Sequence, residues 1–142
     1  RELSRLQSFT QRYKVQASLI FFDVNGFKSI NDTHGHAAGD AALLSVAQTL
    51  VDNLRESDVV GRLGGDEFGV ILVQADDKVS REKAEQLAAA IAARPVHWEG
   101  KSIPLSVAYG VYPLGGGEDP GEALAAADKA MYAHKQAHRA RR

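Results

Sequence analysis

Apolar residues along the chain follow two patterns: continuous runs typical of buried strands, and a spacing of three or four residues typical of helices. Residues 17–24 form an almost unbroken apolar run, which predicts a strand buried on both faces. From Ala37 to Leu54 the apolar residues fall on one stripe, which predicts a helix. Residues 2–14 have the same spacing and predict a further helix at the start of the chain.

The middle of the chain predicts a β-hairpin. Residues 58–63 and 67–73 have the composition of strands, and Gly64-Gly65 between them allows positive φ at both turn positions. Pro95 ends the alanine-rich helix predicted before it, because proline cannot continue a helix. The other predicted elements are a turn or short helix at 27–32, a helix at 80–94, strands at 96–98 and 102–112, and a final helix from 121 to about 139.

The order of these elements favours one class of fold. A single strand followed by a helix and then a hairpin does not repeat as βα units do, which argues against a doubly wound parallel sheet. It fits a ferredoxin-like βαββαβ core, with helices packed on one face of a mostly antiparallel sheet. We therefore predict an α+β fold with an extra β-hairpin, formed by a single domain over residues 1–142.

Composition and charge exclude several classes of function. The net charge is −1, so nothing in the overall balance indicates a nucleic-acid partner. The chain has no cysteine, which excludes disulfides and thiolate zinc sites. No stretch approaches the roughly 20 apolar residues of a membrane span, so we expect no membrane contact from this segment. The chain begins at Arg1, inside a predicted helix, and we expect it to be excised from a longer protein.

Two aspartates occupy positions that suggest chemistry. Asp23 lies near the end of the apolar run, where an unpaired charge is costly to bury. Asp66 and Glu67 follow the Gly-Gly turn, where little side-chain bulk keeps a ligand away. If the strand lies beside the hairpin, Asp23 and Asp66 converge and offer Mg²⁺ the oxygen ligands it prefers. The structural alternative is that one carboxylate merely ends a strand and the other belongs to the turn.

Three blocks of sequence identify a resemblance to a known family. Residues 62–68 read Arg-Leu-Gly-Gly-Asp-Glu-Phe and contain an unbroken GGDEF motif. Residues 23–40 resemble the signature D-x-D-x-F-K-x-I-N-D-x-x-G-H-x-x-G-D, and residues 127–139 resemble A-D-x-A-L-Y-x-A-K-x-x-G-R. Because three long blocks lie in the right order at compatible spacing, the chain resembles the catalytic domain of diguanylate cyclases, the GGDEF domain family.

This resemblance implies a function and a set of partners. The expected activity is the condensation of two GTP molecules into cyclic di-GMP with release of pyrophosphate, on a fold related to nucleotidyl cyclase catalytic domains. The expected cofactor is Mg²⁺, with Mn²⁺ as an alternative. The resemblance also implies a homodimer for catalysis, feedback by cyclic di-GMP, a missing N-terminal sensory or regulatory domain, and a location in the bacterial cytoplasm, with a membrane anchor possible in the full-length protein.

The resemblance assigns roles around the two aspartates. Asp23, Asp66 and the carbonyl of Val24 match the metal ligands, and Asp23 and Asp66 are thereby expected to be catalytic. Glu67 matches a residue that assists deprotonation of the hydroxyl or binds a second ion, and these two roles stay open.

Further positions match the residues that bind GTP. Asn31 and Asp40 match those that read the guanine edge, which suits an amide and a carboxylate. Their structural alternatives are a turn cap for Asn31 and a favourable charge at a helix N-terminus for Asp40. The other positions that match substrate contacts, mostly to phosphates, are Gly26, Phe27, Lys28, Gly64, Gly65, Lys135 and Arg139.

Two basic features have strong structural alternatives. Lys135 and Arg139 share one helix face beside a stripe predicted to be buried, which includes Met131 and His134, but a solvated basic helix end has the same pattern. Arg55 and Asp58 resemble the family's R-x-x-D inhibitory product site ahead of the Gly-Gly turn. An exposed ion pair worth less than about 1 kcal/mol is the alternative at that position.

Departures from the family pattern keep other functions open. Asn25 stands where the first block has a second Asp, and Ala108, Tyr109, His134 and His138 replace usual Ser, Ile, Ala and Gly. The main alternative is therefore a catalytically inactive domain that binds GTP or cyclic di-GMP and signals through an attached domain. A structural ferredoxin-like domain leaves Asp23 and Asp66 unexplained, and cyclisation of a single GTP fits the motifs less well.

Overall fold

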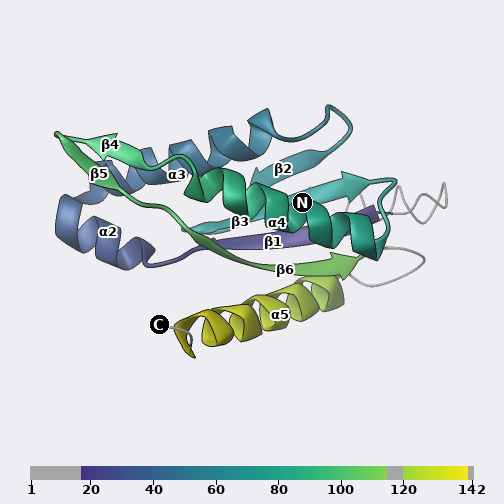
Figure 1. Cartoon of the computed structure of the whole chain (residues 1–142). Coiled ribbons are helices and arrows are strands. Elements are labelled where there is room, and N and C mark those ends of the chain that lie inside the picture. The colour runs from purple at the N-terminus through teal and green to yellow at the C-terminus, as the bar shows by residue number, and fades with distance from the viewer. Residues whose placement is uncertain (1–16, 115–119, 141–142) are drawn as a thin grey trace.

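The computed structural model of the protein describes residues 17–114 and 120–140, so the helix predicted over residues 2–14 lies outside the described part (Figure 1). The elements are β1 (Ala17–Val24), α2 (Phe27–His34), α3 (His36–Asp52), β2 (Val59–Arg62), β3 (Glu67–Val73), α4 (Asp77–Ala92), β4 (Val96–Trp98), β5 (Lys101–Ile103), β6 (Val107–Pro113) and α5 (Pro120–Ala140). Among the described helices, none is both long and apolar enough to cross a lipid bilayer.

Four strands form one antiparallel sheet in the order β2-β3-β1-β6. The central strand β1 pairs with β3 on one side and with β6 on the other. The strands β4 and β5 form a separate hairpin. Helices connect β1 to β2 and β3 onward to the last strand, which is the ferredoxin-like βαββαβ arrangement. The predicted α+β fold with an extra hairpin is confirmed.

Side chains of β1 alternate between two cores, because successive residues of a strand point to opposite faces. Ile20 and Phe22 belong to the larger core, which includes buried residues of α3 and α4. Leu19 and Phe21 belong to the smaller core, which includes Met131 of α5. Burial of a side chain such as that of Phe22, which is 0% exposed, contributes about 2–3 kcal/mol.

Helix α5 therefore covers the face of the sheet opposite to α3 and α4 (Figure 1). The prediction that the helices pack on one face is wrong for this helix. The apolar stripe of a helix shows that it packs against a sheet, but it does not reveal which face of the sheet it covers. The position of α5 matters for the site, because every odd-numbered residue of β1 points toward it.

Helix α4 begins three residues before the predicted start at residue 80. The reason is a local cap: the carboxylate of Asp76 accepts a hydrogen bond from the backbone N–H of Val79 at 2.8 Å. Such a cap satisfies one of the N–H groups that have no partner inside the first turn.

Two turns differ from the sequence prediction. The strand predicted over residues 102–112 is divided into β5 and β6, because Pro104 has no N–H for a ladder and the two parts pair with different strands. Positive φ occurs among the described glycines at Gly26, Gly35 and Gly100, but not at Gly64 or Gly65. The predicted hairpin is present, but its Gly-Gly turn does not use the positive φ that glycine allows.

Candidate functional site

The structure brings the two predicted metal-binding aspartates together at one end of the sheet. Asp23 is the penultimate residue of β1 and lies opposite Glu67 of β3 in the strand register. The backbone N–H of Val24 donates to the carbonyl of Asp66 at 3.1 Å, which ties the end of β1 to the hairpin turn. Asp66 and Glu67 are half-buried beside the buried Asp23, so three carboxylates gather in this region.

Two carboxylates of this cluster have raised pKa values, mainly because they are partly buried and further because neighbouring carboxylates repel them. Burial, followed by a hydrogen bond and repulsion from Asp23, raises the pKa of Asp66 to about 6. Burial, followed by the charges of Asp23 and Asp128, also raises the pKa of Glu67, whereas Lys135 lowers it. A group of carboxylates that resist ionisation is a place where a bound cation is strongly favoured.

Within the part of the chain that the structure describes, the basic side chain that contacts this cluster is that of Lys135 in α5. Its ammonium group is paired with the Oδ2 atom of Asp23. The contact forms because Asp23 has the same strand parity as Leu19 and Phe21, which pack on the α5 side of the sheet. The other oxygen, Oδ1 of Asp23, is buried and has no hydrogen-bond partner among the described residues.

This arrangement fits a divalent metal site of the magnesium type. Within the described part of the chain, no three His, Asp or Glu side chains are grouped so that they could hold an ion by themselves. Mg²⁺ typically takes one or two carboxylates and completes its shell with water and substrate phosphates. Asp23 and Asp66, with one carboxylate oxygen still unpartnered, meet that requirement, and the Val24 carbonyl stays a predicted third ligand.

The loop between β1 and α2 lies directly beside the cluster. Gly26 adopts positive φ (64°) and precedes α2, and none of the side chains that the structure describes caps the start of this helix. The side-chain amide of Asn25, the residue before Gly26, donates to the hydroxyl of Ser106 at 3.1 Å. Lys28 is exposed and Phe27 packs against the larger core, so the uncapped N–H groups of the first turn are free to meet an anion.

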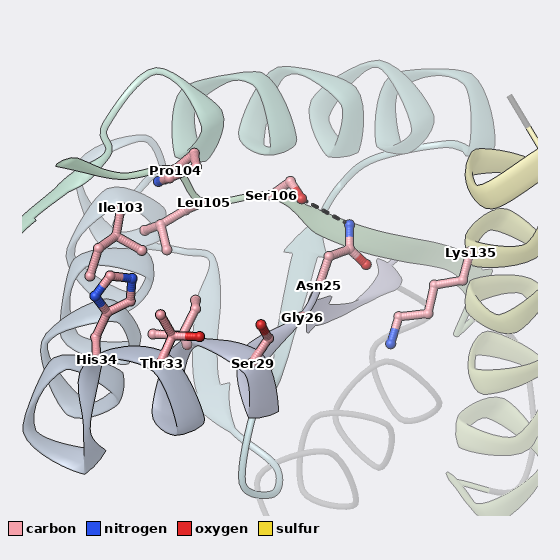
Figure 2. A pocket seen from close by; sticks show the side chains of 11 residues that line it. Asn25, Gly26, Ser29, Thr33, His34, Ile103, Pro104, Leu105, Ser106 and Lys135 are labelled. Carbon is pink, nitrogen blue, oxygen red and sulfur yellow. Dashed lines mark hydrogen bonds between the residues drawn. The ribbon is translucent and has the colours of Figure 1, made fainter. Parts of the chain in front are cut away.

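A pocket of about 530 Å³ opens next to this loop (Figure 2). Its lining residues are Asn25, Gly26, Ser29, Ile30, Thr33, His34, Ile103, Pro104, Leu105, Ser106 and Lys135. Ser29, Thr33 and Ser106 are not among the residues that the sequence motifs indicated. The first two are one helical turn apart on α2, but only the packing of the segment before β6 against that helix creates the pocket.

The predicted guanine-reading residues lie on the facing helices α2 and α3. Asn31 packs so closely against Gly39 that a Cβ atom on Gly39 would lie 1.8 Å from the Oδ1 atom of Asn31. This oxygen is buried, and no residue in the described part of the chain donates a hydrogen bond to it. Asp40 is exposed and lines a groove of about 390 Å³ with apolar residues including Leu43 and Phe68. At the end of α2 the backbone carbonyl of Asn31 accepts the N–H of the cap residue Gly35, so its Oδ1 atom does not make this cap. The structural alternative for Asp40 is wrong, because this residue lies beyond the first turn of α3.

Arg55 and Asp58 form the ion pair that the structural alternative described. The Arg55 side chain lies 3.7 Å from Asp58 and donates to the carbonyl of Val73 at 3.1 Å. Both carboxylate oxygens of Asp58 accept backbone N–H groups, from Arg55 at 3.0 Å and from Val73 at 3.4 Å. The side chain of Asp58 is 1% exposed and that of Arg55 is 66% exposed, so only Arg55 faces solvent. The inhibitory site stays a prediction.

The Gly-Gly turn is held by a residue that sequence analysis did not single out. Arg62 donates from Nε to the carbonyls of Gly64 and Gly65, both at 3.1 Å, and from Nη2 to that of Gly65 at 2.8 Å. Both glycines are exposed, and a Cβ at Gly65 would meet open space. The turn that carries Asp66 is therefore accessible to a ligand and fixed by a side chain from β2.

The end of α5 differs in part from the sequence prediction. Met131 is buried as expected, but His134 is exposed, and its ring lies over Tyr109 with centroids 4.8 Å apart. The prediction that His134 belongs to the buried stripe is wrong, because the width of that stripe depends on how α5 sits on the sheet. The side chain of Arg139 lies outside the described residues, so its predicted phosphate contact stays a prediction.

Comparison with known proteins agrees with this architecture. The family pattern described as "Diguanylate cyclase, GGDEF domain" matches residues 1–141. Diguanylate cyclase DgcP of Pseudomonas aeruginosa is 36% identical over 137 residues, which are 95% of this chain. The chain spans only 20% of the length of that relative.

Solved structures show the same fold. A sensory box/GGDEF family protein from Caulobacter crescentus has a TM-score of 0.85 at 31% identity, covering 95% of this chain and 88% of that one. The GGDEF domain of DgcB from the same organism, solved in complex with c-di-GMP, has a TM-score of 0.88 at 25% identity, covering 96% and 81%. Because the family pattern extends over nearly the whole sequence and the folds agree, the chain belongs to the GGDEF domain family of diguanylate cyclases.

Proposed function

We propose that this chain is an active diguanylate cyclase domain that condenses two GTP molecules into cyclic di-GMP. The observation that carries the proposal is the carboxylate pair of Asp23 and Asp66 at the end of a buried strand, with the pKa of Asp66 raised to about 6. Such a pair suits a reaction in which a metal ion and highly charged phosphates meet in one place. The proposed location is the cytoplasm, where the substrate GTP is available.

The proposed reaction has two equivalent transfers. The 3′-hydroxyl oxygen of one GTP bonds to the α-phosphorus of the other, the bond to pyrophosphate breaks, and the second transfer closes the ring. Glu67 is the candidate base for the hydroxyl proton, since burial and its acidic neighbours raise its pKa toward the range of a useful base. Mg²⁺, or Mn²⁺ in its place, held by Asp23, Asp66 and the Val24 carbonyl, supplies charge neutralisation to the phosphates when bound.

The substrate is proposed to lie along the α2 side of the sheet. The first turn of α2, with Gly26 and Lys28, offers backbone N–H groups and a positive charge to the phosphates. Lys135 stands at the other side of the same loop, where it lines the neighbouring pocket. Asn31 and Asp40 are proposed to bind guanine. The Oδ1 atom of Asn31 accepts no hydrogen bond from any residue that the structure describes, which is consistent with a donor supplied by the substrate.

Two domains are required by the proposed mechanism, because each holds one GTP and the reacting atoms meet only when two sites face each other. The specific activity of the chain should therefore rise with protein concentration, since mass action controls the fraction of dimer. The measurement is initial rate per molecule over a hundredfold range of concentration, with sedimentation recorded on the same samples. A constant specific activity in a sample that is monomeric throughout contradicts the two-domain mechanism.

The direct test is formation of product. The chain is dimerised by an appended coiled coil, incubated with GTP and Mg²⁺, and assayed for cyclic di-GMP and pyrophosphate by mass spectrometry and a coupled phosphate assay. The expected result is two pyrophosphates per cyclic di-GMP, with no product from the Asp66→Asn variant. Product formation by Asp66→Asn at the unmodified rate removes Asp66 from the metal site.

A second candidate function is a binding module that holds GTP or cyclic di-GMP without turnover. The observation that favours it is Asn25, an amide tied to Ser106 at the position where the family pattern has a second carboxylate. Saturable GTP binding by calorimetry with no cyclic di-GMP formed by the dimerised chain establishes this alternative. Replacement by Asn25→Asp then shows whether the missing carboxylate is the cause.

A further inference from the structure

The pair between Lys135 and Asp23 joins two predicted functions in one contact. Asp23 is a predicted metal ligand, and Lys135 is a predicted phosphate-binding residue. In the structure these two side chains bind each other, across 112 positions of sequence. Figure 2 shows the Lys135 side chain extending from α5 into the space beside Asn25 and Gly26.

The environment of Asp23 explains why it needs this partner. The residue is only 8% exposed, and a carboxylate so far from water is costly unless a counterion accompanies it. The neighbouring carboxylates Asp66 and Glu67 add negative charge, and Asp128 contributes to the field from α5. Lys135, itself 24% exposed at its side chain, supplies the positive charge that this group lacks.

An ammonium group and a divalent cation compete for the same carboxylate. A metal ion held by Asp66 and by the unpartnered Oδ1 atom of Asp23 lies on the carboxylate whose Oδ2 atom is paired with the Lys135 ammonium. Two cations on one carboxylate group repel each other, and the repulsion is strong in a site from which water is partly excluded. Lys135 must therefore leave Asp23 before or as the metal binds, and its predicted role as a phosphate-binding residue offers its charge a new partner in the substrate.

We propose that Lys135 is a resident counterion that weakens metal binding in the nucleotide-free domain and moves to the phosphates when nucleotide arrives. The inference rests on the proposed function, because it takes Asp23 and Asp66 as metal ligands. Its consequence is that metal and nucleotide load together rather than in sequence. The alternative is a purely structural ion pair that fastens α5 to the sheet, for which loss of Lys135 gives no gain in metal affinity.

The size of the effect follows from occupancy. If Lys135 covers Asp23 for about nine tenths of the time, the open fraction is about one tenth and the apparent metal affinity falls about tenfold. Removal of the ammonium group should therefore raise the apparent metal affinity about tenfold. A Met side chain at this position keeps the length and apolar stem of Lys without its charge.

The test is a Mn²⁺ titration of the nucleotide-free chain, with unbound Mn²⁺ measured by electron paramagnetic resonance. We compare the unmodified chain, Lys135→Met, and Lys129→Met, a control that removes the same charge from an exposed position of α5. The expected result is binding about tenfold tighter for Lys135→Met, with the control within about twofold of the unmodified chain. Equal or weaker binding by Lys135→Met, or the same gain in both variants, overturns the inference.

A second measurement uses the unmodified chain and does not depend on how a variant folds. Acetylation of Lys135 relative to Lys129 is followed by mass spectrometry with and without Mn²⁺. The inference predicts faster relative labelling of Lys135 when Mn²⁺ is bound, because the amine has left Asp23, and an unchanged ratio under saturating Mn²⁺ overturns it. If neither the unmodified chain nor Lys135→Met binds Mn²⁺, with or without nucleotide, the metal site of the proposed function fails and this inference fails with it.

Discussion

Replacement of Asp66 by Asn should remove activity and yet make the metal-free domain more stable near neutral pH. Burial and the Asp23 carboxylate raise the pKa of Asp66 to about 6, so its neutral form is favoured in the folded chain. The folded pKa is above the unfolded value. The associated stability is therefore fully present below pH 4 and is lost as the pH rises through about 6. Asn keeps the shape and hydrogen-bond donor of the protonated side chain at every pH.

The expected change in the free energy of unfolding is worked out from the pKa of Asp66, which is raised from its ordinary value of 3.8 to about 6. Without screening by solvent, that pKa shift corresponds to a free-energy difference of about 3 kcal/mol between the two protonation states. Asp66 is only half-buried, so water screens much of this, and we expect Asp66→Asn to gain about 1 kcal/mol at pH 7.5. For a domain of this size, that gain raises the melting temperature by about 3 °C.

The assay is urea unfolding of both proteins in a metal chelator, at pH values from 4 to 8. The difference between the two proteins isolates Asp66 and the neighbouring carboxylates that respond to its charge, because titrating groups away from this cluster contribute equally to both curves. We expect the curves to coincide near pH 4 and to separate above pH 6, with Asp66→Asn the more stable. A variant that is less stable at pH 7.5, or a difference independent of pH, refutes the reasoning. Mg²⁺ added in place of the chelator should stabilise the unmodified chain more than Asp66→Asn, because it binds the folded carboxylate pair.

Three further changes test separate parts of the site and fold. Asp40→Ala should weaken GTP binding about tenfold and ATP binding little, because adenine lacks the pair of adjacent donors that a carboxylate recognises on guanine. Both affinities are measured by calorimetry, and equal losses for the two nucleotides would remove the guanine-reading role. Arg55→Ala should weaken cyclic di-GMP binding, since the exposed guanidinium of Arg55 can pair with a phosphate, whereas the control Arg81→Ala, at another exposed position, should leave this affinity unchanged. An unaltered affinity of Arg55→Ala would mean that Arg55 only forms the ion pair with Asp58. Asp76→Ala should lower the free energy of unfolding in urea by about 1 kcal/mol, because it removes the α4 cap, and the neighbouring control Asp77→Ala should lower it by less than about 0.5 kcal/mol. Equal losses of unfolding free energy in the two variants would show that the cap contributes nothing of its own.

Much of the local structure followed from the sequence, because local structure depends on short-range spacing. The apolar run ending at Asp23 predicted a strand buried on both faces, and all eight residues of β1 are buried. The hairpin around the Gly-Gly turn and the order of elements predicted the βαββαβ core. The predicted helix over residues 80–94 missed its start because the Asp76 cap is a hydrogen bond, which hydrophobic spacing does not reveal.

The sequence alone also identified the family, and with it Asp23 and Asp66, because the three motif blocks are contiguous stretches of chain. What surrounds those carboxylates was decided by the tertiary structure. The packing of α5 on the second face of the sheet brings Lys135 to Asp23 across most of the chain. Backbone groups from two segments bury Asp58, a residue that looked available for a ligand. Such contacts depend on which faces meet, and periodicity within one element contains no information about its partner.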